Sequence, residues 1–540
     1  MLALAMLVLP LLAPSPGEGE PARADEKVVK DAGFEADKAG LLDFFRKRSL
    51  TDTERKDCEV LIRRLGSNEF EQRRQASIDL TRRGSVVIPL LRDALHDPDA
   101  EIVRRARDCL DAIDAADPAV PVAAARLLFR RAPDEAVPAL LTYLPYAAGE
   151  QETEELLALF VEMCPAPDKI HPGLSEALRD PLPSRRAVAA YVLGRKGTAN
   201  DCAAVHKLLV DKDTLVRFRA AQGLLGVQDK AAVPALLTLL DEAPVSLAFQ
   251  AEDALYTLAG ERSPSIPGFG AGSDAAERRR CRDAWAAWWK ENESTVDLKR
   301  YAEGERVLGL TLGIEYNTGR VWECGRDKGV RWEIKGLQGP MEAQVLPNGL
   351  VLIAESNNHL VTVRDLKGNV KWEKKIDGEP TGCQRLPSGN TFVSTYNSVL
   401  ELNAKGETVY AFELNGGSNA IRKARNGHII YAKGAEIIEV DTTGKRVRAI
   451  PLRQPGCVGI QDLPGDRFLV TMSKQGQVIE VDANGKVRWE TQVTGACGVA
   501  RLPNGHTLVA ADKHVVELDE QGKPVWDKDA EGYVRRVHRR

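Results

Sequence analysis

Residues 339–378, GPMEAQVLPNGLVLIAESNNHLVTVRDLKGNVKWEKKIDG, decide the fold, because the rest of the C-terminal half repeats them. The turn that ends at Gly349 returns four times, and the steps between equivalent positions are 40, 38, 39 and 39 residues. A second landmark, Asp365-x-x-Gly-x-x-x-Trp372, recurs with the same period. A repeat of about 40 residues with four short apolar segments is typical of one four-stranded propeller blade.

Each copy contains four candidate strands. In the quoted copy they cover residues 342–346, 350–354, 360–363 and 370–373, which are rich in β-branched side chains. Pro-Asn-Gly and Asp-Leu-Lys-Gly supply turns between them. Because a single blade cannot bury both faces of its sheet, we expect the copies to stack around an axis and to leave only short edges exposed.

The two ends of the repeat region predict how the ring closes. Residues 310–335 match strands two to four of a blade, whereas the polar segment 302–306 that precedes them supplies no first strand. After the last blade, residues 532–538 are placed like residues 495–501, which matches His538 with Arg501 and supplies a spare inner strand. The sequence therefore predicts a six-bladed β-propeller over residues 306–540, in which the C-terminal strand completes the first blade.

The N-terminal half has a different period. From about Lys38 to Asn292, apolar residues recur at helical spacing, and Asp-rich breaks such as 96–99 and 211–213 precede helices, where Asp can cap free N–H groups. The units resemble HEAT-like repeats and predict an α-solenoid over residues 25–260. We expect the Asp and Arg side chains at the turns to stabilise repeat stacking. The clearest units are 86–114, 171–197, 202–228 and 230–260.

Residues 261–305 separate the two repeat regions. Gly268 to Gly272 superficially resemble a phosphate-binding loop, but no strand precedes them and no Gly-Lys-Ser/Thr follows, so a plain loop is the better interpretation. A helix over 274–292 carries three tryptophans at i, i+3 and i+4 spacing, which form one stripe. We expect this stripe to cap the last repeat, to dock the solenoid on the propeller, or both; its members are Trp285, Trp288 and Trp289.

Composition limits the class of protein. The 74 basic and 78 acidic residues nearly cancel, which argues against nucleic acid as the main partner, and the nine scattered cysteines favour neither a disulfide framework nor a metal site. Residues 2–13 are almost wholly apolar and Ala22-Arg23-Ala24 resembles a cleavage site, so we predict a signal peptide over 1–24 that is cleaved after Ala24. The run is too short for stable membrane insertion, and a periplasmic, extracellular or cell-surface location is expected.

The order of these parts resembles that of secreted bacterial proteins in which HEAT-like repeats precede a propeller of PQQ-like repeats. The hairpin Asp482 to Trp489, DANGKVRW, is similar to the tryptophan-docking motif of quinoprotein propellers. The Leu-Pro-x-Gly turns and the phrase Val478 to Asp482, VIEVD, resemble arylsulfotransferase propellers. The resemblance implies a fold more than an activity.

The resemblance also raises two enzyme alternatives. A quinoprotein dehydrogenase is expected to have eight blades and usually an adjacent Cys-Cys pair, whereas this chain has six predicted blades and no such pair. An arylsulfotransferase fits six blades but needs an axial His nucleophile, and of the eight histidines only His538 is placed to approach the axis. His428 and His506 follow turns, where we expect exposed positions. We therefore predict no enzyme activity, no cofactor and no metal.

One aromatic column follows the repeats. We expect each member to pack an outer hairpin onto the neighbouring blade, and we expect the blade in which Arg448 interrupts the column to be the weakest. The members are Trp332, Trp372, Tyr410, Trp489 and Trp526.

The inner strands, aligned on Leu346, sort into three further columns. The first is apolar and is predicted to pack between blades: Ala343, Cys383, Ile421, Ile460 and Val499. Amides and arginines in the next two could bind an acidic peptide or a small anion, although the same groups could simply hydrate a channel. The candidate partner- or ligand-binding residues are Gln344, Gln384, Arg385, Arg422, Lys423, Gln461 and Arg501.

A solenoid and a propeller both present broad, rigid surfaces that suit protein or peptide partners. The sequence therefore predicts a non-catalytic interaction scaffold that is exported from the cytoplasm. The alternative is a periplasmic enzyme or small-ligand binder that uses the propeller axis.

Overall fold

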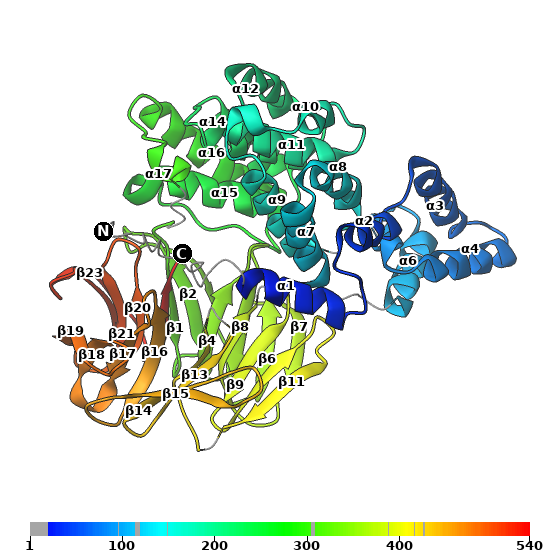
Figure 1. Cartoon of the computed structure of the whole chain (residues 1–540). Helices are drawn as coiled ribbons and strands as arrows, with labels where there is room; N and C mark the ends of the chain where they lie inside the picture. Colours follow the sequence, from blue (N-terminus) through cyan, green and yellow to red (C-terminus); the bar gives the residue numbers. More distant parts are fainter. Residues whose placement is uncertain are drawn as a thin grey trace, which may run out of the picture. The chain divides into compact units, whose positions relative to one another are not determined.

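The computed structural model describes residues 20–95, 97–113, 119–147, 149–303, 308–386, 388–414, 416–424 and 427–540. The chain divides into two compact units, Met1–Asp201 and Cys202–Arg540, and Figure 1 colours it in sequence order. Residues 1–19 of the predicted signal peptide lie outside the described residues, as do His96 and the predicted propeller start at Arg306. Residues 20–24 begin the first described helix.

The first unit is helical, as the periodicity predicts. Thr51 forms a capping box with Glu54, and Asp99 accepts a hydrogen bond from the backbone N–H of Glu101 at 2.8 Å, so the predicted Asp cap is confirmed there. The helices are α1 (Glu20–Asp31), α2 (Lys38–Lys47), α3 (Asp52–Arg64), α4 (Phe70–Arg83), α5 (Ile88–Ala94), α6 (Ala100–Ala112), α7 (Ala119–Arg131), α8 (Pro133–Tyr143), α9 (Glu150–Glu162), α10 (Pro172–Ala177) and α11 (Pro183–Lys196).

An arginine ties neighbouring helical repeats together. Arg185 of α11 donates from Nε to the backbone oxygen of Leu141 at 2.8 Å and pairs with Asp180 at 3.1 Å. Its side chain therefore satisfies a carbonyl near the end of α8, which supports the predicted structural role of Asp and Arg at the turns.

The second unit begins with further helices of the same kind. Asp213 accepts from the backbone N–H of Leu215 at 2.9 Å and caps α13, as predicted. In the described part of the chain, no helix is both long and apolar enough to cross a membrane. The helices are α12 (Ala199–His206), which crosses the division, α13 (Thr214–Leu225), α14 (Ala232–Glu242), α15 (Val245–Ala259), α16 (Ala275–Asn292) and α17 (Lys299–Ala302).

Six four-stranded antiparallel sheets follow, coloured from green to red in Figure 1. The six-bladed propeller predicted from the repeats is confirmed. The first three blades are β24 (Val534–Arg539), β1 (Thr311–Glu315), β2 (Arg320–Cys324) and β3 (Val330–Ile334); β4 (Pro340–Val345), β5 (Val351–Glu355), β6 (Leu360–Arg364) and β7 (Val370–Lys375); and β8 (Pro380–Arg385), β9 (Thr391–Thr395), β10 (Ser398–Leu402) and β11 (Thr408–Glu413). The last three are β12 (Ile421–Lys423), β13 (Ile429–Lys433), β14 (Glu436–Val440) and β15 (Arg446–Pro451); β16 (Cys457–Leu463), β17 (Arg467–Met472), β18 (Gln477–Val481) and β19 (Val487–Gln492); and β20 (Ala496–Arg501), β21 (Thr507–Ala511), β22 (His514–Leu518) and β23 (Pro524–Asp529).

The hydrophobic core lies between successive blades. One cluster joins Ile314 and Trp332 of the first blade to Val351 and Ile353 of the second. All four side chains are buried. Each sheet thus covers a face of its neighbour, which is how the stack buries surfaces that one blade would expose.

The first blade takes its inner strand from the C-terminus, as the repeat count predicts. β24 pairs antiparallel with β1, from Thr311 opposite Arg539 to Ile314 opposite Arg536. A β-bulge at Arg535 shifts the register. The inner strands β4, β8, β16 and β20 have a bulge at the same place. The sequence alignment, which matched His538 with Arg501, is wrong by one residue, because four residues connect β23 to β24 and only three connect β19 to β20.

The aromatic column reaches from blade to blade. The indole N–H of Trp489 donates to the backbone oxygen of Glu520 at 2.8 Å, and that of Trp526 donates to the backbone oxygen of Arg326 at 2.8 Å. Both acceptors lie in the hairpin turn of the next blade. Trp332 and Trp526 are buried, whereas the other members, Trp372, Tyr410 and Trp489, are partly exposed.

Replacing Trp489 with alanine should lower the free energy of unfolding by about 1–3 kcal/mol, less than for a fully buried tryptophan, because part of its ring contacts solvent. Urea unfolding followed by circular dichroism measures the loss. The matched control is Trp489→Phe, which keeps an aromatic ring and loses only the indole N–H. A loss below about 0.5 kcal/mol for Trp489→Ala would place it among ordinary surface substitutions and show that the ring does not hold the blades together.

Candidate functional site

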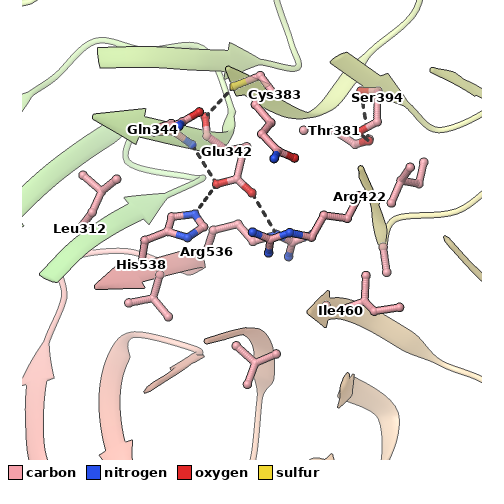
Figure 2. A pocket seen from close by; sticks show the side chains of 18 of the residues that line it. Leu312, Glu342, Gln344, Thr381, Cys383, Ser394, Arg422, Ile460, Arg536 and His538 are labelled. Carbon is pink, nitrogen blue, oxygen red and sulfur yellow. Dashed lines mark hydrogen bonds and ion pairs between the residues drawn. The ribbon is translucent and has the colours of Figure 1, made fainter. Parts of the chain in front are cut away.

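A cavity of about 330 Å³ opens among the inner strands of the propeller, and Figure 2 shows the side chains around it. Small-molecule sites are typically about 300–1,000 Å³, so this one has room for a small ligand or the end of a peptide. Side chains from β4, β8, β12, β16, β20 and β24 line it.

An apolar ring surrounds part of the cavity. It consists of the predicted apolar column and its equivalent on the C-terminal strand, so these side chains both pack between blades and face the cavity. The ring is Ala343, Cys383, Ile421, Ile460, Val499 and Val537.

Glu342 projects into the cavity from a position where the other inner strands are small. Its equivalents by ladder register are Gly382, Ala420, Gly459 and Gly498. On β24 the equivalent residue is Arg536, so this strand also has a large side chain where four of the others have glycine or alanine. The carboxylate and the guanidinium therefore occupy space that the small side chains leave.

Glu342 is held by groups of the C-terminal strand. Its Oε1 lies 2.5 Å from Nε2 of His538, and its Oε2 lies 3.8 Å from Nε of Arg536 (Figure 2). Burial alone would raise the pKa of Glu342, but His538, Arg536 and Arg422 outweigh it and hold this pKa below its usual range. The carboxylate is therefore charged at neutral pH, and His538 does approach the axis, as predicted.

The predicted polar column reaches the cavity at three positions, Gln344, Gln384 and Arg422. Gln344 accepts a hydrogen bond from the backbone N–H of Arg385 at 2.7 Å. Gln461, which does not line the cavity, accepts one from the backbone N–H of Arg501 at 2.6 Å. These amides thus join inner strands of neighbouring blades.

The next column, which the sequence placed beside the axis, turns toward the blade contacts instead. Lys423 pairs with Glu401 at 2.5 Å, and Arg501 pairs with Glu480 at 2.7 Å. Arg385 donates to the backbone oxygen of Gly389 at 2.8 Å. These three side chains do not line the cavity, and their binding of a partner remains a prediction.

The glutamates that pair with Lys423 and Arg501 belong to a ring that lies opposite the aromatic column. The third strand of five blades carries a glutamate there, and the second blade has Val363. In three blades the inner strand of the next blade supplies a cation, which for Glu517 is Arg539. The ring is Glu323, Glu401, Glu439, Glu480 and Glu517.

In the fourth blade, the cation that pairs with the ring glutamate comes from the same blade. The next inner strand offers Asp462, which cannot neutralise Glu439, and Arg448 on β15 pairs with Glu439 at 2.6 Å. Arg448 thus replaces both the aromatic residue and the missing cation. It gives that blade an ion pair in place of aromatic packing, which the prediction that this blade is the weakest did not consider.

Exchanging the two residues together should preserve stability better than changing either alone. Arg448→Trp leaves Glu439 without its guanidinium and should cost about 1–3 kcal/mol, whereas adding Asp462→Arg should recover at least half of that loss. Urea unfolding of the single and double variants, followed by circular dichroism, measures the coupling. If the double variant loses as much free energy of unfolding as the two single variants together, the proposed exchange of roles between these positions is wrong.

Two histidines also contact glutamates of this ring. Nδ1 of His428 lies 2.7 Å from Glu439, and Nδ1 of His506 lies 2.8 Å from Glu517. Both side chains are partly buried. The expectation that they occupy exposed positions is therefore wrong, because the residue after each turn faces the neighbouring glutamate.

A second charge cluster joins α15 to the first blade, within residues 202–540. Arg331 contacts both oxygens of Glu252 at 3.0 Å and Glu323 at 2.6 Å. Arg540 contacts Glu323 at 2.9 Å and both oxygens of Asp253 at 2.9 Å. Two arginines and three carboxylates thus alternate across this contact.

The tryptophan stripe of α16 packs behind the same cluster. The ring of Trp285 meets Tyr256 of α15 edge-on at 4.8 Å, and its N–H points to Glu252 at 3.4 Å. Trp288 donates to the backbone oxygen of Arg262 at 2.6 Å, and Trp289 is buried beside it. The stripe therefore caps the last repeat and, through Glu252, supports its contact with the propeller.

The loop before α16 lies against the propeller. Gly268 donates its backbone N–H to the oxygen of Arg331 at 3.0 Å, and Phe269 is buried. A Cβ at Gly268 would approach Trp332 to 2.8 Å. The glycine serves close packing, which accords with the loop interpretation.

Burial raises the pKa of Asp253 to about 6, although Arg540 lowers it, and Glu252 and Glu323 raise it further. In the unfolded chain this carboxyl has its ordinary pKa of 3.8. The higher pKa in the folded protein therefore stabilises the fold below about pH 4, and this stabilisation is lost as pH rises through 6. Asp253→Asn should therefore gain stability relative to the wild type between pH 4 and 7, measured by urea unfolding. A difference that does not change with pH would contradict this assignment.

Sequence reasoning missed Glu342, Arg536 and the glutamate ring. One signal for Glu342 was available, since a single glutamate interrupts a column of glycine and alanine. Arg536 was not assigned to that column because the connection from β23 to β24 is one residue longer than the connection from β19 to β20, to which the sequence alignment matched it.

Two family models match parts of the chain. Residues 172–255 match a model described as HEAT repeats, and residues 433–539 match a PQQ-type model described as outer membrane protein assembly factor BamB. The chain therefore carries HEAT repeats followed by a six-bladed propeller of PQQ-like repeats, as the resemblance implied. No curated protein matches it.

Solved structures share parts of the chain's shape. A protein of unknown function from Bacteroides caccae is 17% identical with a TM-score of 0.37, covering 42% of this chain and 97% of its own. Virginiamycin B lyase from Staphylococcus aureus is 15% identical with a TM-score of 0.29, covering 34% and 68%. The WD40 propeller domain of Doa1 is 12% identical with a TM-score of 0.35, covering 42% and 82%. Such low similarity transfers neither ligand nor activity.

Proposed function

We propose that this protein is an exported, non-catalytic scaffold that holds protein partners on its HEAT repeats and its propeller. The alternating charge cluster between α15 and the first blade carries the proposal. The side chains of its central members are at most 5% exposed: Arg331, Glu252 and Glu323. Because a buried charge without its partner is strongly destabilising, the cluster favours the arrangement in which all three meet. Within residues 202–540, two repeat types are therefore fixed into one platform.

The blade contacts support a rigid platform. Two cations that the sequence placed beside the axis, Lys423 and Arg501, form ion pairs with glutamates of the preceding blade. Rigid surfaces lose little conformational entropy when they bind a partner. The propeller is thus suited to recognition through its exposed rims.

Export is the part of the proposal that rests on the N-terminal sequence. Residues 2–13 are apolar and Ala22-Arg23-Ala24 follows them. The description of the model that matches residues 433–539, an outer membrane protein assembly factor, supports a location in the cell envelope.

The test uses the full chain with an affinity tag inserted after Ala24, because Arg540 pairs with Asp253 of α15 and with Glu323 of the first blade, and a C-terminal tag would disturb these contacts. A photo-crosslinking amino acid replaces exposed Phe70 or Tyr396, and buried Phe249 serves as the control site. We expect cleavage after Ala24, recovery in the envelope fraction, and cross-linking of defined proteins at the exposed sites alone. An uncleaved cytoplasmic protein, or equal cross-linking at all three sites, would refute the proposal.

A further inference from the structure

We infer that the axial cavity is a binding site for a carboxylate group. The first observation is the charge balance of its lining. Four arginines line it, and two of them, Arg539 and Arg540, pair with carboxylates that lie outside the lining. The other two are Arg422 and Arg536, whereas Glu342 is the single side-chain carboxylate among the described lining residues. His538 adds a third group that can carry positive charge. The cavity therefore holds an excess positive charge that a bound anion would neutralise.

Arg422 is the side chain that can make the defining contact. Within the described residues no carboxylate oxygen lies within 4.0 Å of its guanidinium, whereas Arg536 lies 3.8 Å from Glu342. Figure 2 shows Arg422 directed into the cavity toward Glu342. A planar guanidinium binds a carboxylate through two parallel N–H donors, a geometry that a lysine cannot supply.

The amide of Gln344 is oriented as a donor. Its Oε1 is occupied by the backbone N–H of Arg385 at 2.7 Å. The Nε2 group, which has only donor capacity, is then the part left for a ligand in the cavity. Gln384 lines the same wall. The polar wall therefore favours an acceptor, and a carboxylate is an acceptor with a negative charge.

The apolar ring defines the rest of the ligand. Ile421, Ile460 and Val499 line the cavity together with Phe392 and Leu312. A ligand that places its charge against Arg422 would place its carbon skeleton against these side chains. The site thus fits a small organic acid with an apolar body, or the free C-terminal carboxylate of a peptide with an apolar last residue. This inference stands independently of the scaffold proposal.

The experiment compares an acid with its uncharged amide on the full chain. Fluorine NMR follows 4-fluorobenzoate and 4-fluorobenzamide at constant ionic strength, and each titration gives a dissociation constant. We expect the benzoate to bind and the benzamide to bind at least tenfold more weakly. Arg422→Gln should weaken benzoate binding at least tenfold, because it removes the charge and the paired donors. The matched control, Arg446→Gln, changes an exposed arginine of the same blade and should leave binding unchanged.

A second variant protects the test against misfolding. Gln384→Glu adds a carboxylate to the cavity wall and should abolish benzoate binding while circular dichroism stays native. Two tripeptides, one with a free C-terminus and one amidated, then compete with the benzoate. Displacement by the free acid alone identifies a peptide terminus, and displacement by neither identifies a small organic acid; both support a carboxylate site. Equal binding of acid and amide, no binding of the benzoate, or full binding to Arg422→Gln would overturn it.

Discussion

Replacing Arg331 with alanine should lower the free energy of unfolding by about 3–5 kcal/mol, because removal of one partner from a buried ion pair leaves charges without compensation. The side chains of Glu252 and Glu323 are 1% and 0% exposed, so water cannot take over from the guanidinium. The substitution also removes the contact of Arg331 with the ring of Tyr256, at 4.4 Å from its centroid.

Tryptophan fluorescence during urea unfolding measures this effect selectively. All eight tryptophans lie between residues 285 and 526, so the signal reports the second unit alone. Arg280→Ala, an exposed change on α16, is the matched control and should stay within about 0.5 kcal/mol of the wild type. A loss below 1 kcal/mol for Arg331→Ala would show that the cluster does not fix α15 to the propeller.

Neutralising the whole cluster should rescue part of this loss. In the variant Arg331→Met, Glu252→Gln and Glu323→Gln, no unpaired charge remains among these three positions, and replacement of complete buried ion pairs is often nearly neutral. A triple variant that is less stable than Arg331→Ala would mean that packing, and not charge, holds the contact.

Deletion of residues 532–540 should abolish cooperative unfolding of the propeller. The deletion removes β24 and exposes the edge of β1, which would otherwise be paired along Thr311 to Glu315. It also removes Arg539 and His538 from Glu517 and Glu342, and takes buried Val534 and Val537 out of the core. Because several destabilising mechanisms act together in this deletion, we expect its loss of free energy of unfolding to exceed the roughly 4–5 kcal/mol that is exceptional for a single substitution.

A peptide supplied in trans tests whether closure itself is responsible. A synthetic peptide with the sequence of residues 531–540 should restore a sharp fluorescence transition to the truncated protein, because it can occupy the vacant inner strand. A peptide of scrambled sequence is the control and should not. If the truncated protein alone melts like the full chain, the closing strand is dispensable.

Closure of the ring could be predicted because strand supply can be counted along the chain. The sequence lacks one strand before residue 310 and has one too many after Trp526, and the structure pairs them. The register of that strand was predicted one residue off, because the connection from β23 to β24 has four residues and the connection from β19 to β20 has three. Loop length can vary between copies without changing the strands, so the period alone does not set this register.

For the aromatic column and the inner-strand columns, the sequence predicted which positions are equivalent but not always where their side chains point. The period identified Trp489 and Trp526 as contacts between blades, because a large aromatic at every repeat has few other roles. It did not separate Gln344, which lines the cavity, from Lys423, which pairs with Glu401. Neighbouring positions on a strand point to opposite faces, and the direction depends on register.

The sequence by itself determined the succession of HEAT repeats and a six-bladed propeller of PQQ-like repeats, because both architectures are built from local periods of apolar and turn residues. Only the tertiary structure decided which charges meet. Arg331 and Glu252 are 79 residues apart in the chain, and His538 and Glu342 are 196 apart. Such pairs form when separate elements pack at a fixed distance and direction, which no local pattern encodes. The axial cavity and the charge cluster on α15 are therefore properties of the closed fold.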